Sequence, residues 1–215
     1  QASLLYERGL YAGALGDLTS ALRAYRDFIR LVDGNLEPSH LVTGWRTLAY
    51  TERLHGDYDS AKEHVVQSIN LAESLGLSAH VARGLALCAS IAHDMGDIDA
   101  ARAGFSRLVD MGDARIARRG FWEAEHLLAL GERDAAIEMI AANVAACEKF
   151  GWAGHVAHGR VLWGLAIAEH DPSAAERHLE AARSWVVISG EVEMATRVHE
   201  LAAQVALSRK AHFEA

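Results

Sequence analysis

Proline and cysteine are almost absent from this sequence, since its 215 residues contain two of each. Proline interrupts helices, so its scarcity, together with abundant alanine, favours helical structure and disfavours a sheet-rich fold. Cys88 and Cys147 form no metal-binding or redox motif, and each lies in an apolar stretch. We therefore expect two buried thiols in a reducing compartment, which predicts a cytoplasmic protein.

Positive charge is also in short supply. Lysine and arginine number 21 against 29 aspartates and glutamates, which gives a formal net charge of −8. Nucleic acids and anionic membranes attract basic proteins, so neither is an expected partner. No apolar run is long enough to cross a bilayer, and no signal-peptide pattern is present. The sequence begins at Gln1 without a methionine, which leaves open a fragment of a longer protein whose other domains hold further activity.

Catalytic and metal-binding motifs are missing as well. The sequence has no GxSxG nucleophile motif, no glycine-rich phosphate loop and no HExxH zinc motif. Among its 12 histidines, His155 and His158 are three residues apart, which is a spacing compatible with metal ligation. However, no acidic or cysteine partner lies in the same helical turn. We expect no catalytic residue, no metal and no cofactor, and we predict that the chain is not an enzyme.

The dominant feature that is present is a cassette that occurs about five times. It consists of a helical stretch, a Gly-Asp break and a second helix with an alanine near its start. The breaks are Gly16-Asp17, Gly56-Asp57, Gly96-Asp97, Gly131-Glu132 and His170-Asp171, and the alanines are Ala21, Ala61, Ala101, Ala136 and Ala175. Successive alanines are 40, 40, 35 and 39 residues apart. A period in this range indicates stacked helical hairpins, which favours binding over catalysis.

The capping signals predict an all-α, right-handed solenoid that forms a single domain over residues 1–215. Its five hairpins are expected at 2–34, 40–76, 79–112, 114–151 and 153–190, with a capping helix at 191–208. Their helices are predicted at 2–15, 17–33, 40–55, 58–75, 79–95, 98–111, 114–130, 133–150, 153–169 and 173–188. Asp17, Asp57 and Asp97 are expected to cap helix N-termini, and a glycine follows each second helix.

The spacing also predicts how the hairpins pack. Each cassette alanine should lie where the two helices of its hairpin approach closely. The bulky residue four positions later should fill the gap to the next hairpin, and these residues are Tyr25, Val65, Phe105, Ile140 and Leu179. A large residue in place of Ala61 or Ala101 is expected to overpack this seam, at a cost of about 1–3 kcal/mol.

The second repeat, Trp45-x-x-Leu48-Ala49…Gly56-Asp57-Tyr58-x-x-Ala61, resembles the tetratricopeptide-repeat (TPR) family. The other repeats keep parts of this pattern, so the resemblance covers nearly the whole chain. The period is nearer 40 residues than the family's usual 34 or so, which is similar to the long repeats of kinesin light chains, the bacterial maltose-regulon activator and Rap-type quorum-peptide receptors. HEAT and armadillo repeats share the period but lack the Gly-Asp-x-x-x-Ala signature.

The resemblance implies that the first helix of each hairpin lines a concave groove. On that basis, the groove face collects basic and aromatic side chains, namely Arg46, Tyr50, Arg53, Arg83, His93, Arg118, Phe121 and Arg160. Arginine recognises carboxylates and phosphates through two parallel hydrogen bonds, so this face predicts a site for an acidic or C-terminal peptide. The alternative is that these arginines pair with glutamates on neighbouring helices.

Taken together, the patterns predict a non-enzymatic scaffold that binds a protein or peptide. The alternative function is a ligand-sensing regulatory domain of a larger bacterial signalling or transcription-regulating protein, as the resemblance to the maltose-activator type implies. The final helix is expected to cap the stack. If it leaves Met194 and Leu207 exposed, it can instead pair with a second copy, and Trp152, Trp163 and Trp185 mark the C-terminal repeats as a place for a homodimer contact.

Overall fold

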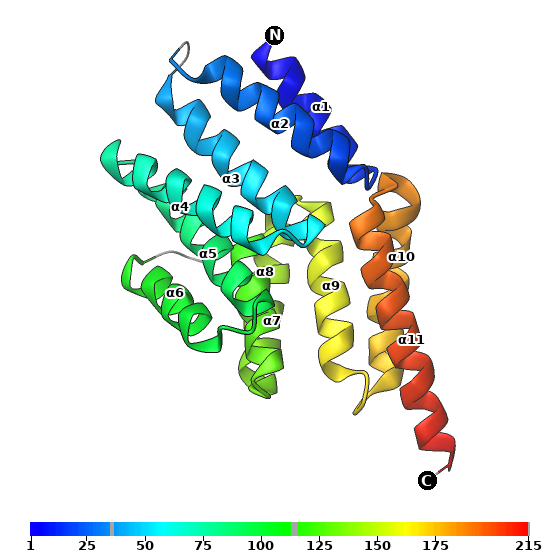
Figure 1. Cartoon of the computed structure of the whole chain (residues 1–215). Helices are drawn as coiled ribbons and strands as arrows, with labels where there is room; N and C mark the ends of the chain where they lie inside the picture. The colour runs from blue at the N-terminus through cyan, green and yellow to red at the C-terminus, as the bar shows by residue number, and fades with distance from the viewer. Residues whose placement is uncertain (35–36, 113–115, 215) are drawn as a thin grey trace. The chain divides into compact units, whose positions relative to one another are not determined.

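A computed structural model describes residues 1–34, 37–112 and 116–214, with side chains up to residue 211. The chain divides into two compact units, Gln1–Ala114 and Arg115–Ala215. Unit 1 holds six helices (Figure 1): α1 (Ala2–Ala14), α2 (Leu18–Val32), α3 (Pro38–His55), α4 (Tyr58–Ser74), α5 (Ser78–Asp94) and α6 (Ile98–Asp110). Unit 2 holds five: α7 (Arg118–Ala129), α8 (Arg133–Lys149), α9 (Ala153–Ile167), α10 (Pro172–Ser189) and α11 (Val192–Glu214).

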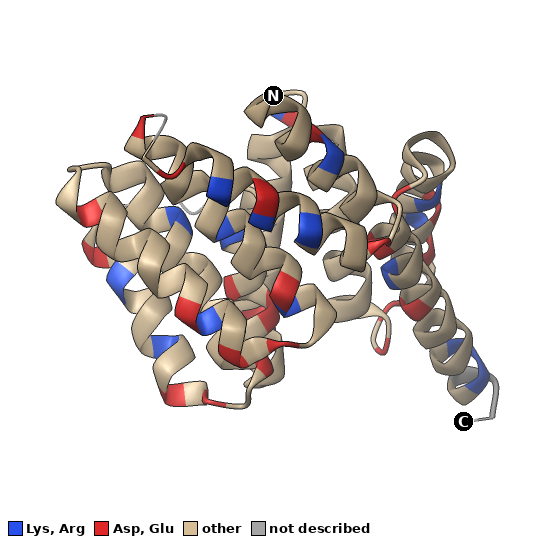
Figure 2. Cartoon of the chain, turned by 45° about the horizontal axis from the view of Figure 1, so that its top comes forward, with Lys and Arg blue, Asp and Glu red and all other residues tan. Residues whose placement is uncertain are grey.

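The predicted all-α fold is confirmed, because the described residues form these eleven helices and no strand. Successive helices pair as hairpins, α1 with α2, α3 with α4 and α5 with α6 in unit 1, and α7 with α8 and α9 with α10 in unit 2. Acidic and basic positions are interspersed along these helices (Figure 2). The expectation of one domain over residues 1–215 stays a prediction.

Two predicted helix boundaries differ from the structure by more than two residues. The seventh helix begins at Arg118 instead of residue 114, and residues 114 and 115 lie outside the described part of the chain. Ala117 has φ 62°, which is incompatible with a right-handed helix. The amide of Asn143 holds it there: Oδ1 accepts from the Ala117 N–H at 2.7 Å, and Nδ2 donates to the Ala117 carbonyl at 2.8 Å. The last helix runs to Glu214, beyond the predicted end at residue 208.

The Gly-Asp breaks work as the sequence predicted. Their glycines, Gly16, Gly56, Gly96 and Gly131, have φ values of 79°, 87°, 78° and 78°, which L side chains rarely adopt. The aspartate that follows three of these glycines caps the next helix, as Asp57 does by accepting from the Ser60 N–H at 3.2 Å. Asp17, Asp97 and Asp171 cap in the same way, whereas the side chain of Glu132 makes no capping hydrogen bond. The positive-φ glycine therefore recurs at four of the five breaks, and the aspartate cap recurs at four of the five, with Gly131-Glu132 lacking the cap and His170-Asp171 lacking the glycine.

The seam between helices is fully closed. All five cassette alanines are completely buried, and the bulky residues four positions later are buried beside them. The approach is very close at Gly159, where an added Cβ would lie 2.3 Å from Cγ2 of Val144, and at Gly9, where it would lie 2.5 Å from Cε1 of Tyr25. Small residues on the first helices therefore allow the large side chains of the second helices to fill the core.

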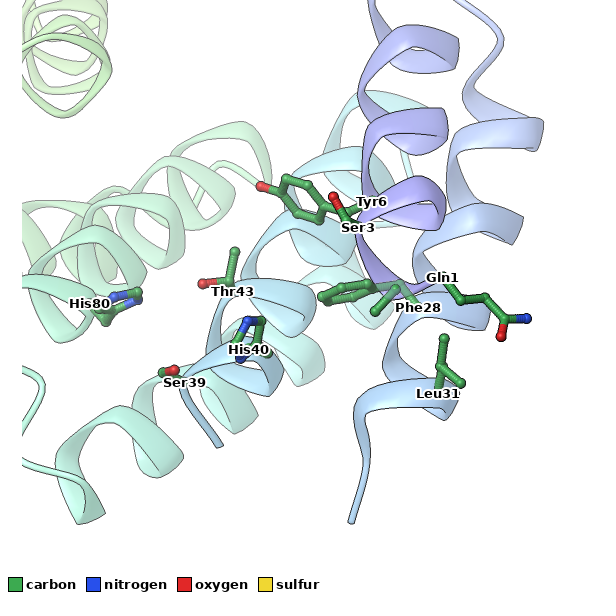
Figure 3. A pocket seen from close by; sticks show the side chains of 10 residues that line it. Gln1, Ser3, Tyr6, Phe28, Leu31, Ser39, His40, Thr43 and His80 are labelled. Carbon is green, nitrogen blue, oxygen red and sulfur yellow. The ribbon is translucent and has the colours of Figure 1, made fainter. Parts of the chain in front are cut away.

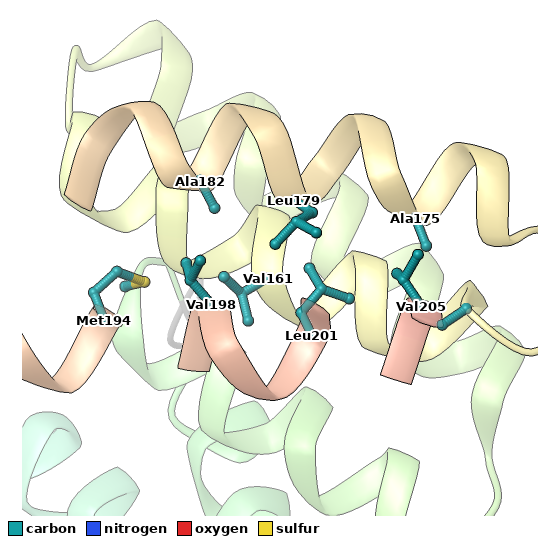
Figure 4. Packing of buried hydrophobic residues seen from close by; sticks show 9 residues of the cluster. Val161, Ala175, Leu179, Ala182, Met194, Val198, Leu201 and Val205 are labelled. Carbon is teal, nitrogen blue, oxygen red and sulfur yellow. The ribbon is translucent and has the colours of Figure 1, made fainter. Parts of the chain in front are cut away.

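Unit 2 is completed by α11, which packs against α9 and α10. Val198, Leu201 and Val205 of α11 meet Val161 and Leu179 in one buried cluster (Figure 4). The structure corrects one prediction here, because the side chain of Met194 lies inside this cluster and is not exposed. Leu207 is exposed, which is one of the two conditions stated above for pairing of this helix with a second copy.

Candidate functional site

The first helices of the three hairpins of unit 1 line a cavity of about 740 Å³, which we call the groove pocket (Figure 3). Its apolar side comes from α1 and α2 and includes Tyr6, Phe28 and Leu31. The ring of Tyr6 packs against two other aromatic rings. Its centroid lies 5.8 Å from that of Tyr25, in an edge-on contact, and 5.4 Å from that of Phe28. The pocket therefore has a firm aromatic wall.

The opposite side of the groove pocket is polar. Ser39, His40 and Thr43 come from α3, and His80 comes from α5. Figure 3 shows His80 on one side, Tyr6 and Phe28 on the other, and His40 and Thr43 between them. None of the ten residues that line the cavity is an aspartate or glutamate. The polar side thus offers hydroxyl and imidazole groups without negative charge.

Positive charge lies close to this polar side. Burial, together with the charges of Arg83 and Arg46, lowers the pKa of His80 below its ordinary value. Both guanidinium groups therefore act electrostatically on His80, a residue of the pocket wall, and the lowered pKa favours its neutral form. Arg83 of α5 is exposed. Arg46 and Tyr50 of α3 are half-buried.

Another predicted groove arginine is already engaged inside unit 1. The Arg53 side chain is 9% exposed, and its Nε and Nη2 donate to the two carboxylate oxygens of Asp94 at 2.6 and 3.3 Å. This two-pronged pair ties α3 to α5. For Arg53, the structure therefore supports the alternative interpretation, in which the arginine forms an ion pair with an acidic side chain of a neighbouring helix. His93, one residue before Asp94, is half-buried.

The remaining predicted residues lie in unit 2, where the prediction needs a correction. Phe121 is completely buried and packs in a cluster with Ile140 and Val144, so it belongs to the core and cannot line a groove. Arg160 pairs with Glu148 at 2.7 Å and lines a different cavity. Arg118 is half-buried, and its charge helps to lower the pKa of His155 to about 4, after the larger effect of burial.

Comparison with known proteins was informative only for the fold. No protein-family model and no curated protein sequence matches the chain. Among solved structures, aspartyl phosphate phosphatase F from Bacillus subtilis is 14% identical with a TM-score of 0.71, over 98% of this chain and 59% of that one. Kinesin-light-chain TPR-like repeats from Podosopora anserina are 16% identical with a TM-score of 0.54, over 94% and 95% of the two chains.

The chain adopts the tetratricopeptide-repeat fold. BtubC from P. vanneervenii is similar too, at 16% identity and a TM-score of 0.54, over 87% of this chain and 74% of that one. These identities establish the fold alone. The chain also spans less than two thirds of the phosphatase, so function has to be argued from the TPR surface itself.

The sequence prediction did not include Ser3, His40 and His80 of the groove pocket, although the register contains a signal for them. Ser3, Thr43 and Arg83 are 40 residues apart, each 18 residues before a cassette alanine. His40 and His80 share a position in the same way, 21 residues before Ala61 and Ala101. Residues in equal register lie on equivalent faces of successive first helices, so these side chains come together. Phe28 and Leu31 carry no such signal, because they belong to a second helix.

A buried carboxylate in unit 1 was also missed. Glu52 is completely buried, with Arg26 Nη2 at 3.2 Å from its Oε1 and His64 Nδ1 at 2.6 Å from its Oε2. The His64 ring stacks on Trp45 with centroids 4.9 Å apart. These contacts join α2, α3 and α4, which makes the cluster a structural element.

A second polar cluster lies inside unit 2. Arg197 Nη1 lies 2.6 Å from Glu125 Oε1, and the buried His158 lies beside the same oxygen at 3.9 Å. Burial lowers the pKa of His158, against the raising effect of Glu125. The cluster connects α7, α9 and α11, the helices that occupy first-helix positions of this unit.

Other classes of site find no support in the part of the chain that the structure describes. It contains no group of three or more histidine, cysteine or acidic side chains placed to hold a metal ion. Across the same residues, no helix is both long and apolar enough to cross a membrane. Cys147 is buried as expected and Cys88 is half-buried, and burial raises the pKa of both thiols. Raised pKa values leave both thiols protonated and poorly reactive near neutral pH.

Proposed function

We propose that the groove pocket of unit 1 binds a segment of a partner protein that carries acidic side chains or a C-terminal carboxylate. The observation that supports the proposal most is the composition of the pocket wall: about 740 Å³ of space without a carboxylate, beside Arg46 and Arg83. A carboxylate entering this space would meet positive charge and no acid of the wall. The proposed activity is binding without catalysis.

The two sides of the pocket divide the recognition between them. Tyr6, Phe28 and Leu31 offer an apolar surface for one side chain of the bound segment. Thr43 and His80 offer hydrogen-bonding groups opposite. Guanidinium groups make the strongest contacts with carboxylates, because their hydrogen bonds are charge-assisted and often paired. A segment with an apolar residue next to an acidic group therefore fits best.

A second candidate is regulation by a small ligand. The volume of the groove pocket falls within the range of about 300–1,000 Å³ that small-molecule sites occupy. In this function, a small anionic ligand in the pocket would control other domains of a larger signalling or transcription-regulating protein. The ligand would use the same arginines, so its size separates the two candidates.

The test is a binding measurement with defined peptides. An Asp- and Glu-rich peptide library with free C-terminal carboxylates is selected on the immobilised chain, and the best binder is measured by calorimetry. The double variant Arg46→Glu/Arg83→Glu should weaken binding by at least about tenfold, since each lost charge-assisted contact is worth about 1.5–3 kcal/mol. Binding should also weaken as salt increases.

A matched control separates this site from general charge effects. Arg107 in α6 is exposed and pairs with Glu73, away from the residues that line the pocket. Arg107→Glu changes the net charge by the same amount per residue and should leave the affinity unchanged. If Arg46→Glu/Arg83→Glu binds the peptide as well as the wild type does, the proposal is wrong. If only small anions bind, the second candidate replaces the first.

A further inference from the structure

Four large apolar side chains are exposed together on unit 2, and we call them the end patch: Phe150, Trp152, Val187 and Ile188. Their exposed fractions are 52%, 44%, 85% and 80%. The rings of Phe150 and Trp152 stack with centroids 4.9 Å apart. The two pairs adjoin, because Gly151 and Ile188 line the same cavity of about 450 Å³. Exposed apolar surface of this kind commonly marks an interface.

The register of the repeats shows that the fold does not require apolar residues at positions 187 and 188. Val187 and Ile188 follow the cassette residue Ala175 by 12 and 13 positions. At the same offsets, the other four repeats carry Asp33-Gly34, Glu73-Ser74, Asp113-Ala114 and Glu148-Lys149. The first of these positions is therefore acidic in four repeats and valine in the fifth alone. An exposed valine and isoleucine in this place serve something other than the packing of the hairpin.

The cavity beside the end patch supplies a complementary surface. Val156, Ala157 and Trp185 give it an apolar lining. Glu148 and Arg160 also line it and pair with each other at 2.7 Å, both partly exposed to solvent. The surface thus combines protruding apolar side chains, a hollow of matching character, and one acid with one base.

This combination is complementary to itself. In a dimer with two-fold symmetry, the same patch of both copies meets, so each feature must find its counterpart within one patch. A protruding residue must face a hollow, and an acid must face a base. One end patch contains what both conditions require: Ile188 is 80% exposed beside the cavity, and Glu148 and Arg160, which pair within one copy, are both partly exposed and can exchange partners across a two-fold axis. A purely acidic or purely basic rim would instead repel its own copy.

We propose that a second copy of this chain covers the end patch and forms a two-fold symmetric dimer. Val187 and Ile188 make the apolar centre of the interface, with Phe150 and Trp152 at its side. Aromatic and aliphatic side chains in the centre and charged side chains at the rim are the arrangement found in homodimers. The interface lies in unit 2 and does not depend on the groove pocket.

The first test is the mass of the chain in solution by sedimentation equilibrium, over protein concentrations from about 1 to 200 μM, the range in which a modest interface dissociates. The wild type should show a reversible monomer–dimer equilibrium. Val187→Glu/Ile188→Lys introduces the pair that the fourth repeat carries at these offsets, so the hairpin should still fold. It should raise the dimer dissociation constant at least about tenfold, because it removes the centre of the interface. Leu4→Glu replaces an apolar residue of α1 that is 74% exposed, and it should leave the equilibrium unchanged.

The second test uses charge exchange at the rim. Glu148→Arg and Arg160→Glu each leave two like charges on the rim, so each variant alone should be monomeric. An equimolar mixture of the two should form a heterodimer, because each basic rim then faces an acidic one. A wild type that stays monomeric across the concentration range overturns the proposal. A dimer that survives Val187→Glu/Ile188→Lys also overturns it, since the contact would then lie elsewhere.

Discussion

The buried carboxylate of Glu52 gives the sharpest stability prediction. Its two oxygens are satisfied by Arg26 and His64, and the side chain has no exposed area. His64→Phe keeps a ring against Trp45 but removes the nitrogen that lies 2.6 Å from Oε2. A change that leaves a buried charge uncompensated costs about 3–5 kcal/mol. Arg26 remains at 3.2 Å and is about half exposed, so we expect a smaller loss, about 2–3 kcal/mol.

Urea unfolding followed by circular dichroism measures this loss as a lower midpoint with an unchanged slope. The second variant, Glu52→Leu/His64→Phe, removes the buried carboxylate together with its partner. We expect it to recover most of the stability, to within about 1 kcal/mol of the wild type, because no buried charge is left unpaired. The reasoning is refuted if His64→Phe costs less than about 0.5 kcal/mol, or if the double variant is no more stable than His64→Phe.

Three further predictions concern the repeat and its titrating groups. Ala101→Leu should lower the free energy of unfolding by about 1–3 kcal/mol, because Ala101 is completely buried in the seam; an unchanged urea midpoint would contradict the close contact. Asp57→Ala should lower the free energy of unfolding by about 1 kcal/mol, because it removes a helix cap. Glu132→Asp should raise it by about 0.5–1 kcal/mol, because it creates the cap that α8 lacks, and urea midpoints measure both changes. Burial and the charges of Arg160 and Arg177 lower the pKa of His178 to about 4, so the unfolded chain binds a proton first as the pH falls. The stability should be full above about pH 6.5 and should fall between pH 6.5 and 4 by about 1–2 kcal/mol, allowing for partial exposure, and His178→Gln should remove this part of the pH dependence.

The fold was predictable because its determinants repeat. The Gly-Asp break sets a positive φ and a helix cap within two residues, and the alanine four or five positions later sets the close contact. Each signal is local, and its recurrence with a period near 40 places the hairpins. The start of α7 was not predictable for the opposite reason. It depends on Asn143, 26 residues away, whose amide holds Ala117 in a non-helical conformation.

The candidate site was only partly predictable. Helix periodicity correctly placed Arg46 and Arg83 on the first helices, but it could not show which arginines already have partners. Arg53 lies on the same helix as Arg46, and only the structure reveals that Asp94 of α5 engages both its prongs. Periodicity also placed Phe121 on the groove face, whereas a close approach at Gly159 buries it. Contacts between neighbouring hairpins determine whether such a side chain is paired or buried, and the periodicity of a single helix does not reveal those contacts.

The central claim is that the groove pocket binds an acidic segment, and an amide NMR titration with the selected peptide tests it most directly. We predict saturable shift changes concentrated at Ser3, Tyr6, Thr43 and His80, with the side-chain signals of Arg46 and Arg83 changing in parallel. The same peptide with its acids replaced by glutamine and its C-terminus amidated should produce little change. Changes confined to α4 and α6, or equal changes with the neutral peptide, would contradict the claim.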